Sequence, residues 1–302
     1  MASRPEIPQA GIFALGTSSH AYLEFDLAAG ADPEALVTGL AGLREPRMTI
    51  GGVNLVLGFR PELWRDALGA PAPEDLDGFG EAISGSDGFT MPATQHDALL
   101  WLAGSVYDVI FDEARDAISA LNGVASVASE VSSWPYRHDR DLTGFIDGSE
   151  NPSLALAPGV ALVPDGAPGA GGSILLLQRW AHDARDWESL SAEEQEAVIG
   201  RTKPDSVELD PRPETSHVAR TDQDDFGEIF RRNMPYGTVT EHGTMFVGFA
   251  AEQAPPRRML VSMAGVDGPR DALTLYTTPL TGAYYFVPAL SALAAYAPEE
   301  AD

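Results

Sequence analysis

The sequence repeats one arrangement of a strand and a helix, and this repetition constrains the fold more than any other feature. Residues 98–104 (ALLWLAG) form an apolar run typical of a buried strand, and residues 106–121 follow with the pattern of a helix. Residues 244–250 (TMFVGFA) and 254–265 repeat that order about 150 residues later, as an internal duplication would. The chain is therefore predicted to contain two related α+β units.

Further strand and helix pairs occur in both halves. Residues 21–27 (AYLEFDL) alternate like a half-buried strand, and residues 32–43 then follow a helical pattern. Residues 173–179 (SILLLQR) form the corresponding strand, and residues 191–200 a helix that opens with a capping box. This order predicts duplicated ferredoxin-like units with antiparallel β-sheets and peripheral helices. Shorter elements are predicted at 54–60 and 125–131 (strands) and 61–68 (helix).

Stretches rich in glycine and proline suggest where the units divide. Residues 157–172 (APGVALVPDGAPGAGG) are predicted to form a hinge loop, which gives units at 1–156 and 157–302. Residues 71–88 form a second irregular stretch, and residues 298–302 (PEEAD) are expected to fray.

Composition excludes several classes of protein. The chain has 45 acidic and 19 basic residues in 302, a net charge of −26, which opposes binding to nucleic acid and to anionic membranes. No apolar run approaches the ~18 residues that span a bilayer, and the N-terminus lacks the pattern of a secretory signal. A cytoplasmic protein is therefore expected. The absence of cysteine excludes thiolate ligation, so an iron centre would need histidine.

Residues 144–152 (GFIDGSENP) place Asp147 between apolar residues and glycines. The apolar neighbours favour burial, and the glycines permit a tight turn or close approach to a flat ligand. An unpaired buried carboxylate is costly, so Asp147 is expected to meet a cation or to have a perturbed pKa suited to proton transfer. The ordinary alternative is an Asx-turn, in which the carboxylate bonds its own backbone.

Three other segments accompany this motif in a fixed order. They are residues 215–217 (TSH), 231–237 (RRNMPYG) and 280–288 (LTGAYYFVP). Together the four segments resemble the dye-decolorising peroxidase family, and the absence of large insertions is most similar to its compact bacterial B-type members. The resemblance spans most of the chain.

The resemblance implies a function and a cofactor. It implies a peroxidase with haem b, held mainly by the second unit, that reduces hydrogen peroxide. Phenolic, dye-like or other small donors would then be oxidised through a ferryl porphyrin radical intermediate. Two alternatives remain open at this point: a haem-binding or iron-handling protein without significant turnover, and a cofactor-free interaction module.

His217 occupies the position of the family's proximal iron ligand, which the sequence places in a proline-rich loop. A neutral imidazole donates electron density to iron, and its other ring nitrogen usually donates to a carboxylate. Asp271 is the candidate partner, with Asp267 as a nearby rival. His242 is the main rival ligand. The remaining histidines are interpreted as ordinary polar residues: His20, His96, His138 and His182.

The resemblance also implies the groups on the peroxide side. Asp147 would act as acid and base, and Arg231 would stabilise developing charge and hold the carboxylate ionised. Asn233 would supply a further hydrogen bond. Arg232 is expected to point away from Arg231 into solvent if the segment is extended.

The remaining candidates concern the walls of the pocket. Phe246 and Thr244 would face the peroxide side if residues 244–250 alternate as a strand, although ordinary core packing is the alternative for Phe246. Arg201 and Asn151 are placed to meet haem propionates, and Arg201 could equally be a surface residue.

The expected partners are hydrogen peroxide and a small reducing substrate, in a homo-oligomer. The C-terminal residues lack the extension that loads some family members into encapsulin shells, so no such targeting tail is predicted. Four aromatic residues are candidates for electron relay, with ordinary packing as the alternative: Trp134, Tyr136, Trp180 and Trp187.

Overall fold

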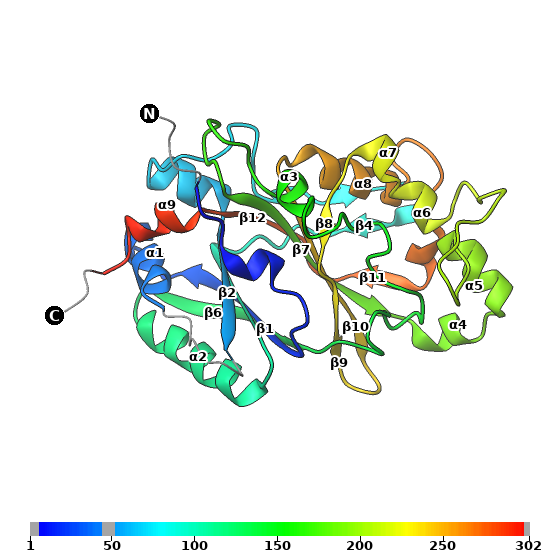
Figure 1. Ribbon diagram of the computed structural model, residues 1–302, viewed down its shortest axis with the longest axis horizontal. Helices are drawn as coiled ribbons and strands as arrows, with labels where there is room; N and C mark the ends of the chain where they lie inside the picture. Colours follow the sequence, from blue (N-terminus) through cyan, green and yellow to red (C-terminus); the bar gives the residue numbers. More distant parts are fainter. Residues whose placement is uncertain (1–5, 44–51, 299–302) are drawn as a thin grey trace.

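The computed structural model describes residues 6–43 and 52–298 (Figure 1). Over these ranges the main sheet has ten strands in the order β11-β7-β12-β2-β5-β1-β6-β9-β10-β8, and β7 also pairs with β10. The pairings between its strands are antiparallel. The additional pairing makes β7, β12, β2, β5, β1, β6, β9 and β10 a closed circuit.

The first half supplies the elements up to residue 133. They are η1 (Ala10–Phe13), β1 (Ser19–Leu27), α1 (Pro33–Ala41), β2 (Val53–Phe59), η2 (Leu63–Ala67), β3 (Ile83–Ser84), η3 (Ser86–Gly88), β4 (Thr90–Met91), β5 (Ala98–Gly104), α2 (Tyr107–Ala120) and β6 (Ala125–Ser133).

The second half supplies the others. They are α3 (Ala157–Ala161), β7 (Ser173–His182), α4 (Ala184–Glu188), α5 (Ala192–Ile199), α6 (His217–Arg220), α7 (Gln223–Phe226), β8 (Phe230–Arg231), β9 (Met234–Gly237), β10 (His242–Ala250), α8 (Ala254–Ala264), η4 (Ala272–Leu275), β11 (Thr277–Pro279), β12 (Ala283–Val287) and α9 (Leu290–Ala294).

The predicted duplication is confirmed by the strand order. The first half contributes β6-β1-β5-β2 and the second contributes β12-β7-β10-β9, so in each half the first strand lies between the third and the fourth. This is the order of a ferredoxin-like unit. The two sets meet at their edges through single pairs, Phe59 with Phe286 and Ser133 with Tyr236. The predicted boundary between residues 156 and 157 lies between the two sets and stays a prediction.

A core shared by both halves lies inside the circuit of strands. Side chains alternate across a strand, so every second residue of β5, β7 and β10 points inward. Trp101, Leu175 and Phe249 belong to this inner core and are almost fully buried. The inner core joins the halves because both contribute to the same apolar cluster.

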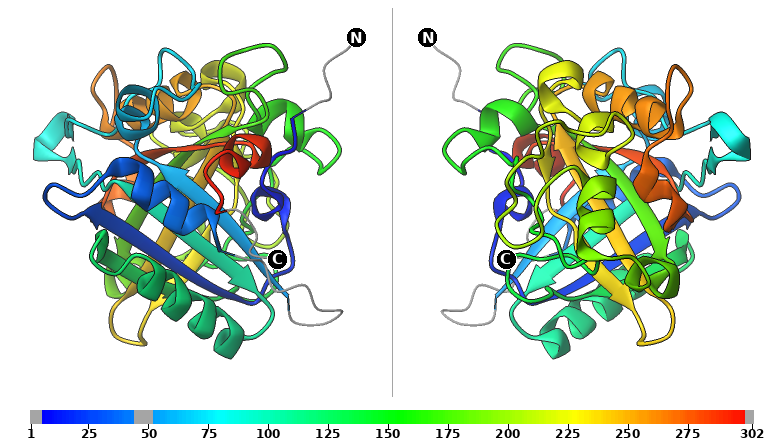
Figure 2. Two further views of the ribbon diagram at one scale, coloured as in Figure 1. Left: turned by 90° about the vertical axis from the view of Figure 1, so that its left-hand side faces the viewer. Right: turned by 90° about the vertical axis from the view of Figure 1, so that its right-hand side faces the viewer.

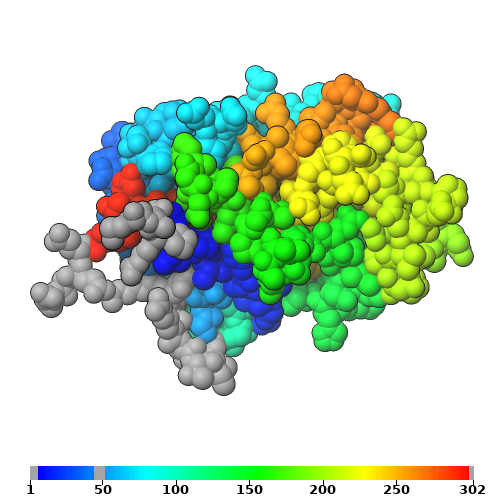
Figure 3. Space-filling model, turned by 45° about the horizontal axis from the view of Figure 1, so that its top comes forward, coloured from blue at the N-terminus to red at the C-terminus, as the bar shows by residue number. Residues whose placement is uncertain are grey.

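The outer faces of the two sets of strands carry different covers. Helices α1 and α2 lie across the outer face of the first set, as the left view of Figure 2 shows. Helices α4 to α8 lie at the other end of the molecule, beside β7 and β10 (Figure 1). The segment between the halves, coloured green, crosses the middle of the face in Figure 3, between blue N-terminal residues and yellow residues of the second half.

Several local predictions change in the structure. The strand predicted at 173–179 continues to His182, and the stretch 157–172 contains the short helix α3. The helix expected at 61–68 is present over residues 61–67 and contains the π-helical turn η2. The capping box at the start of α5 is confirmed. The fraying predicted for residues 298–302 falls, apart from Pro298, outside the described residues. Across residues 6–43 and 52–298, every helix is too short or too polar to cross a membrane.

Candidate active site

His217 is held at the start of helix α6 rather than within the irregular loop that the sequence suggests. Ser216 caps this helix, and its buried hydroxyl accepts a hydrogen bond from the backbone of Ala219 at 3.4 Å. A side-chain cap of this kind fixes the first helical turn. The imidazole of His217 therefore has a defined backbone support at the wall of a mainly apolar cavity.

Asp271 supports the other side of the imidazole. Its Oδ2 lies 2.6 Å from Nδ1 of His217, and its Oδ1 accepts a hydrogen bond of 2.8 Å from the backbone of Leu273. The carboxyl is fully buried. With Nδ1 donating to Asp271, Nε2 is left as the basic nitrogen, which is the arrangement of an imidazole that binds a metal. The contact is made by Asp271 and not by its rival Asp267.

Electrostatics at His217 follow from this pair. Burial lowers the pKa of His217, but the charge and hydrogen bond of Asp271 outweigh burial and hold the pKa above its ordinary value. The buried carboxylate therefore increases the electron density available on the ring.

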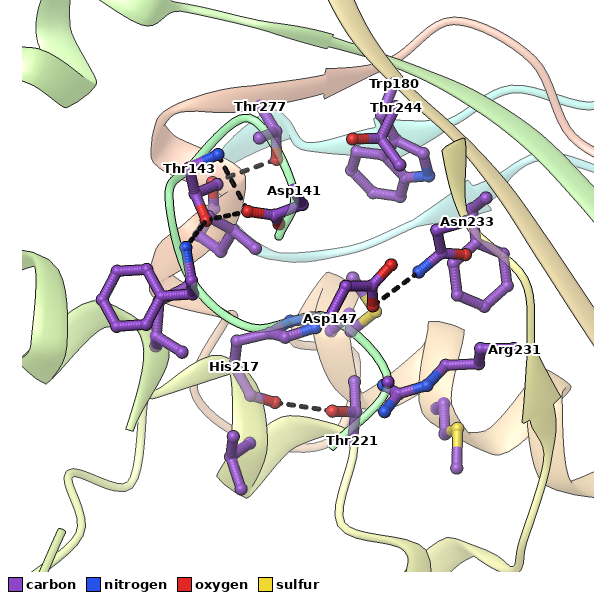
Figure 4. A pocket seen from close by; sticks show the side chains of 18 of the residues that line it. Asp141, Thr143, Asp147, Trp180, His217, Thr221, Arg231, Asn233, Thr244 and Thr277 are labelled. Carbon is purple, nitrogen blue, oxygen red and sulfur yellow. Dashed lines mark hydrogen bonds between the residues drawn. The ribbon is translucent and has the colours of Figure 1, made fainter. Parts of the chain in front are cut away.

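Asp147 reaches the same hollow from the loop between β6 and α3. Its backbone N–H donates to the carbonyl of Asp139 at 2.8 Å. Gly144 and Gly148 have φ of 87° and 75°, so the loop needs the left-handed conformations that glycine adopts without strain. Figure 4 shows the carboxylate of Asp147 turned toward the amide of Asn233, with Arg231 nearby. The loop thus delivers a carboxylate into an apolar place, as the motif predicted.

Burial dominates the ionisation of Asp147. It raises the pKa of Asp147 above its ordinary value, while the charge of Arg231 and hydrogen bonds from Asn233 and the backbone of Gly148 oppose the rise. The Gly148 contact retains part of the Asx-turn alternative. Burial thus favours the protonated form of Asp147, and the charge of Arg231 favours its ionised form.

Asn233 and Arg231 are positioned by the backbone around them. Oδ1 of Asn233 accepts from the backbone of Val247 at 3.1 Å, so its Nδ2 is the atom that donates to Asp147, at 3.3 Å. Nε of Arg231 is buried and has no hydrogen-bond partner within the described ranges. Buried donors are normally paired, so an unpaired one at a cavity wall indicates a group awaiting a ligand.

Asn151 holds the backbone of Arg231, a contact that the sequence did not suggest. Its side chain donates to the carbonyl of Arg231 at 2.8 Å and accepts from the N–H of Arg231 at 2.9 Å. Both ends of the amide are thereby used, and Asn151 does not line the main cavity. Asn151 therefore clamps the backbone of Arg231, and its contact with a haem propionate stays a prediction.

Arg201 does line the cavity. It forms an ion pair with Glu150 and donates to the carbonyl of Ser206 at 2.8 Å. Its Nε is buried and unpaired among the residues described. Arg201 is therefore partly neutralised by protein groups and keeps one donor for an anion.

Arg232 was expected in solvent, and that prediction is wrong. The side chain is 3% exposed, its guanidinium carbon lies 4.4 Å from the centre of the Trp101 ring, and it donates to the carbonyls of Gly11 and Ala14. Alternation does turn Arg232 away from Arg231, but the opposite side is the inner core rather than water. Stacking on tryptophan and bonds to carbonyls compensate the buried cation.

Asp141 is a site residue that the sequence reading missed. It lines the cavity, and Thr143 donates to it through both its hydroxyl and its backbone. Burial and then the charge of Asp147 raise the pKa of Asp141 to about 6. No local pattern distinguishes this residue from other loop aspartates; only its distance in space from Asp147 reveals it.

The other histidines are mostly engaged elsewhere. The rival His242 lies outside the cavity, with Nδ1 near the carbonyl of Thr238 at 3.2 Å. His20 accepts from Trp101 at 3.2 Å, and His96 pairs with Asp26 at 2.8 Å. His182 was also interpreted as ordinary, yet it lines the cavity and bonds the hydroxyl of Thr244 at 3.1 Å. The extension of β7 past residue 179 places it there.

The cavity enclosed by these groups has about 1210 Å³ of space not filled by atoms, part of it open to solvent. Phe246 and Thr244 line it, as predicted from strand alternation, together with apolar residues from β7 and α8: Leu176, Trp180, Pro256, Met259, Leu260 and Met263. An apolar slot with a carboxylate-backed imidazole and unpaired arginine donors fits a planar, anionic iron porphyrin.

Comparisons with known proteins agree with this geometry. The family model described as "Dyp-type peroxidase, C-terminal" matches residues 138–292. A dye-decolorizing peroxidase of Rhodococcus erythropolis is 35% identical over 300 residues, covering 94% of this chain and 87% of the relative. The chain belongs to the Dyp-type peroxidase family. Members of this family are haem peroxidases, so this chain is an enzyme that uses haem and a peroxide.

Solved structures of Dyp-type peroxidases have the same fold. The crystal structure of a dye-decolorizing peroxidase from Bacteroides thetaiotaomicron superposes with a TM-score of 0.88 at 27% identity, covering 96% of this chain and 98% of that one. A DypB variant from Rhodococcus jostii, solved in complex with heme, has a TM-score of 0.84 at 32% identity, covering 95% and 97%. The resemblance inferred from four short segments therefore extends over the whole fold.

Proposed function

We propose that His217 binds the haem iron of this Dyp-type peroxidase and that Asp147, Arg231 and Asn233 act on the peroxide. The observation that carries the proposal is that one cavity holds an imidazole backed by a buried carboxylate and, in the same space, a carboxylate flanked by a guanidinium and an amide. These are the groups that iron ligation and peroxide cleavage require.

Bound haem would supply the iron centre at which peroxide reacts and the store for the two oxidising equivalents. Asp147 would accept the proton from one oxygen of hydrogen peroxide and return it to the other, so that water can leave. Arg231 would hold the carboxylate ionised and stabilise the negative charge that develops as the O–O bond breaks. Asn233 would orient the carboxylate through its Nδ2.

A second hollow supplies a route to these groups. It shares Asp147, Arg231, Asn233 and Thr244 with the cavity and is also lined by the exposed residues Leu15 and His138. A small uncharged molecule such as hydrogen peroxide can pass along it without disturbing the apolar wall formed by β7 and α8. Arg201 would bind an acidic edge of the haem with its unpaired donor.

The donors proposed are phenols, dyes and other small reductants, each giving one electron. The alternative of haem handling without turnover would need His217 and the cavity but not the trio of Asp147, Arg231 and Asn233. Two hydrogen-bonding or charged groups beside the carboxylate of Asp147, those of Arg231 and Asn233, favour catalysis over haem handling. The homo-oligomer and the cytoplasmic location remain predictions from the sequence.

The test is the absorption spectrum of the haem-loaded protein before and after one equivalent of hydrogen peroxide. We expect a fast change of the Soret band that is slowed in Asp147→Ala and Arg231→Leu variants. A haem carrier would bind haem with a normal Soret band and show no such change.

A further inference from the structure

A separate hollow, here called the outer groove, lies on the other side of the cavity wall. It is bordered by helix α4, the connection between β9 and β10, and the chain around Trp134 and Tyr136. It has about 1060 Å³ of space not filled by atoms and opens to solvent. Nothing in the roles proposed above uses it.

The outer groove and the cavity share part of their walls. Thr143, His182, Leu273 and Thr277 line both spaces. A residue that lines two hollows has no other residue standing between them, so at these positions the partition is one side chain thick. A molecule in the outer groove would sit next to the cavity without entering it.

The lining of the outer groove is aromatic and partly exposed. Trp134 is 38% exposed, and Val239, at the tip of the connection between β9 and β10, is 96% exposed. Exposed apolar side chains gathered around a hollow indicate a ligand or partner. Tyr136 and Tyr276 add two further rings, and flat rings favour the binding of another flat ring.

The floor of the outer groove is rigid. Trp187 is buried, its Nε1 donates to the carbonyl of Thr143 at 3.0 Å, and its ring contacts those of Phe145 at 6.2 Å and Tyr276 at 5.5 Å between centroids. A packed aromatic floor presents a surface that needs little reorganisation on binding.

The charge of the outer groove selects among donors. Glu188 is the only carboxylate in its lining, and no lysine or arginine lines it over the described ranges. Burial and the nearby His242 lower the pKa of His182 to about 4, so this wall residue is uncharged near neutral pH. With a net charge of −26 on the chain, anionic donors are repelled and gain no cation here.

We propose that the outer groove binds the reducing substrate, a small uncharged aromatic donor of the methoxyphenol type, and that its electron crosses the shared wall into the cavity. The proposal rests on the peroxidase function proposed above. For each hydrogen peroxide, two phenols each lose one electron to the oxidised enzyme and one proton to water. The peroxide O–O bond breaks, two electrons and two protons convert the peroxide to two waters, and two phenoxyl radicals leave.

The test uses the haem-loaded enzyme with 2,6-dimethoxyphenol as probe and two variants, Trp134→Ala and Val239→Asp. Phe111→Ala is the matched control, because Phe111 is an aromatic residue 53% exposed on α2 that lines neither hollow. Loss of the Trp134 ring in one variant, and of the apolar Val239 side chain in the other, is expected to raise KM and the calorimetric Kd, measured without peroxide, by about 2- to 10-fold. kcat, the rate of reaction with peroxide and turnover of hexacyanoferrate(II), a polyanionic donor, should stay at the wild-type values.

Unchanged Kd and KM in both groove variants would overturn the proposal and would place the donor in the cavity or on another surface. Val239→Asp is expected to fold normally, because the side chain of Val239 is almost wholly exposed. Failure of the wild-type enzyme to react with peroxide would refute the proposed function instead, while calorimetric binding would still decide whether the outer groove takes a phenol.

Discussion

The outer faces of the two sets of strands are built on the same plan but have opposite contents. In the first half Leu23 pairs with Leu100 across β1 and β5, and both are fully buried beneath α1 and α2. In the second half Gln178 pairs with Phe246 across β7 and β10, at the same place in the strand order, and both line the cavity. One copy of the unit is filled and the other is hollow.

The difference shows how a duplicated fold acquires a site. Leucines and helices close the first face, whereas the second face is opened by a polar side chain, Gln178, whose Nε2 has no partner among the described residues. The long segment between β7 and β9 brings His217 to this face, and the loop after β6 brings Asp147. The proposed catalytic residues therefore line the outer face that is less closely packed.

The largest effect is expected from removing the imidazole of the hollow half. His217→Ala should abolish the coordinated haem spectrum and reaction with peroxide, because no other histidine supported by a buried carboxylate lines the cavity in the described chain. Absorption spectroscopy after reconstitution measures this. His96→Ala, in the filled half, is the control and should bind haem normally; an unchanged Soret band in His217→Ala would contradict the assignment.

A smaller but still large effect is expected at Asp147. Asp147→Ala should bind haem normally and react with hydrogen peroxide about 10²- to 10⁴-fold more slowly, the usual contribution of general acid–base catalysis. Stopped-flow absorption gives the rate constant. Asp139→Ala serves for comparison, because Asp139 supports Asp147 only through its backbone carbonyl; equal rates in the two variants would remove Asp147 from the mechanism.

In the haem-free protein, the same kind of truncation should reduce stability differently on the two outer faces. Leu100→Ala should lower the free energy of unfolding by about 2–5 kcal/mol, since it leaves a void in a filled face. Phe246→Ala should cost less than the ~3–5 kcal/mol usual for a buried phenylalanine, because its ring already borders empty space. Urea unfolding measures both. A loss for Phe246→Ala at or above that range would show that the second face is packed rather than hollow.

The subtlest effect concerns pH. Burial raises the pKa of Asp147 and the charge of Arg231 opposes the rise, so Arg231→Leu should raise that pKa further. Asp147 must be ionised to accept a proton, and its ionised form is lost as the pH falls through its pKa. The acidic limb of the peroxide rate profile should therefore move to higher pH in Arg231→Leu. The control is Arg115→Leu, which removes an exposed cation in the first half of the chain. It should leave the acidic limb of the rate profile at the same pH.

Some of this molecule could be predicted from local patterns. The strand at 98–104 and the helices that follow both repeats are where periodicity placed them, because an apolar run and a helical pattern are properties of neighbouring residues. The pairing of His217 with Asp271 came from a motif order rather than from periodicity. The prediction for Arg232 was wrong because strand alternation says only that neighbouring side chains point to opposite faces. The packing of the two halves turned the face that holds Arg232 into the inner core.

The chain itself determined the duplicated ferredoxin-like plan, the acidic character and the segment that carries Asp147, since periodicity, charge and glycine conformations are properties of neighbouring residues. Only the tertiary structure decided which outer face stays hollow, that Asn151 clamps Arg231, that Asp141 joins the site and that the outer groove shares a wall with the cavity. Each of these depends on residues far apart in the chain meeting in space. Distances between such residues follow from packing, which no local pattern encodes.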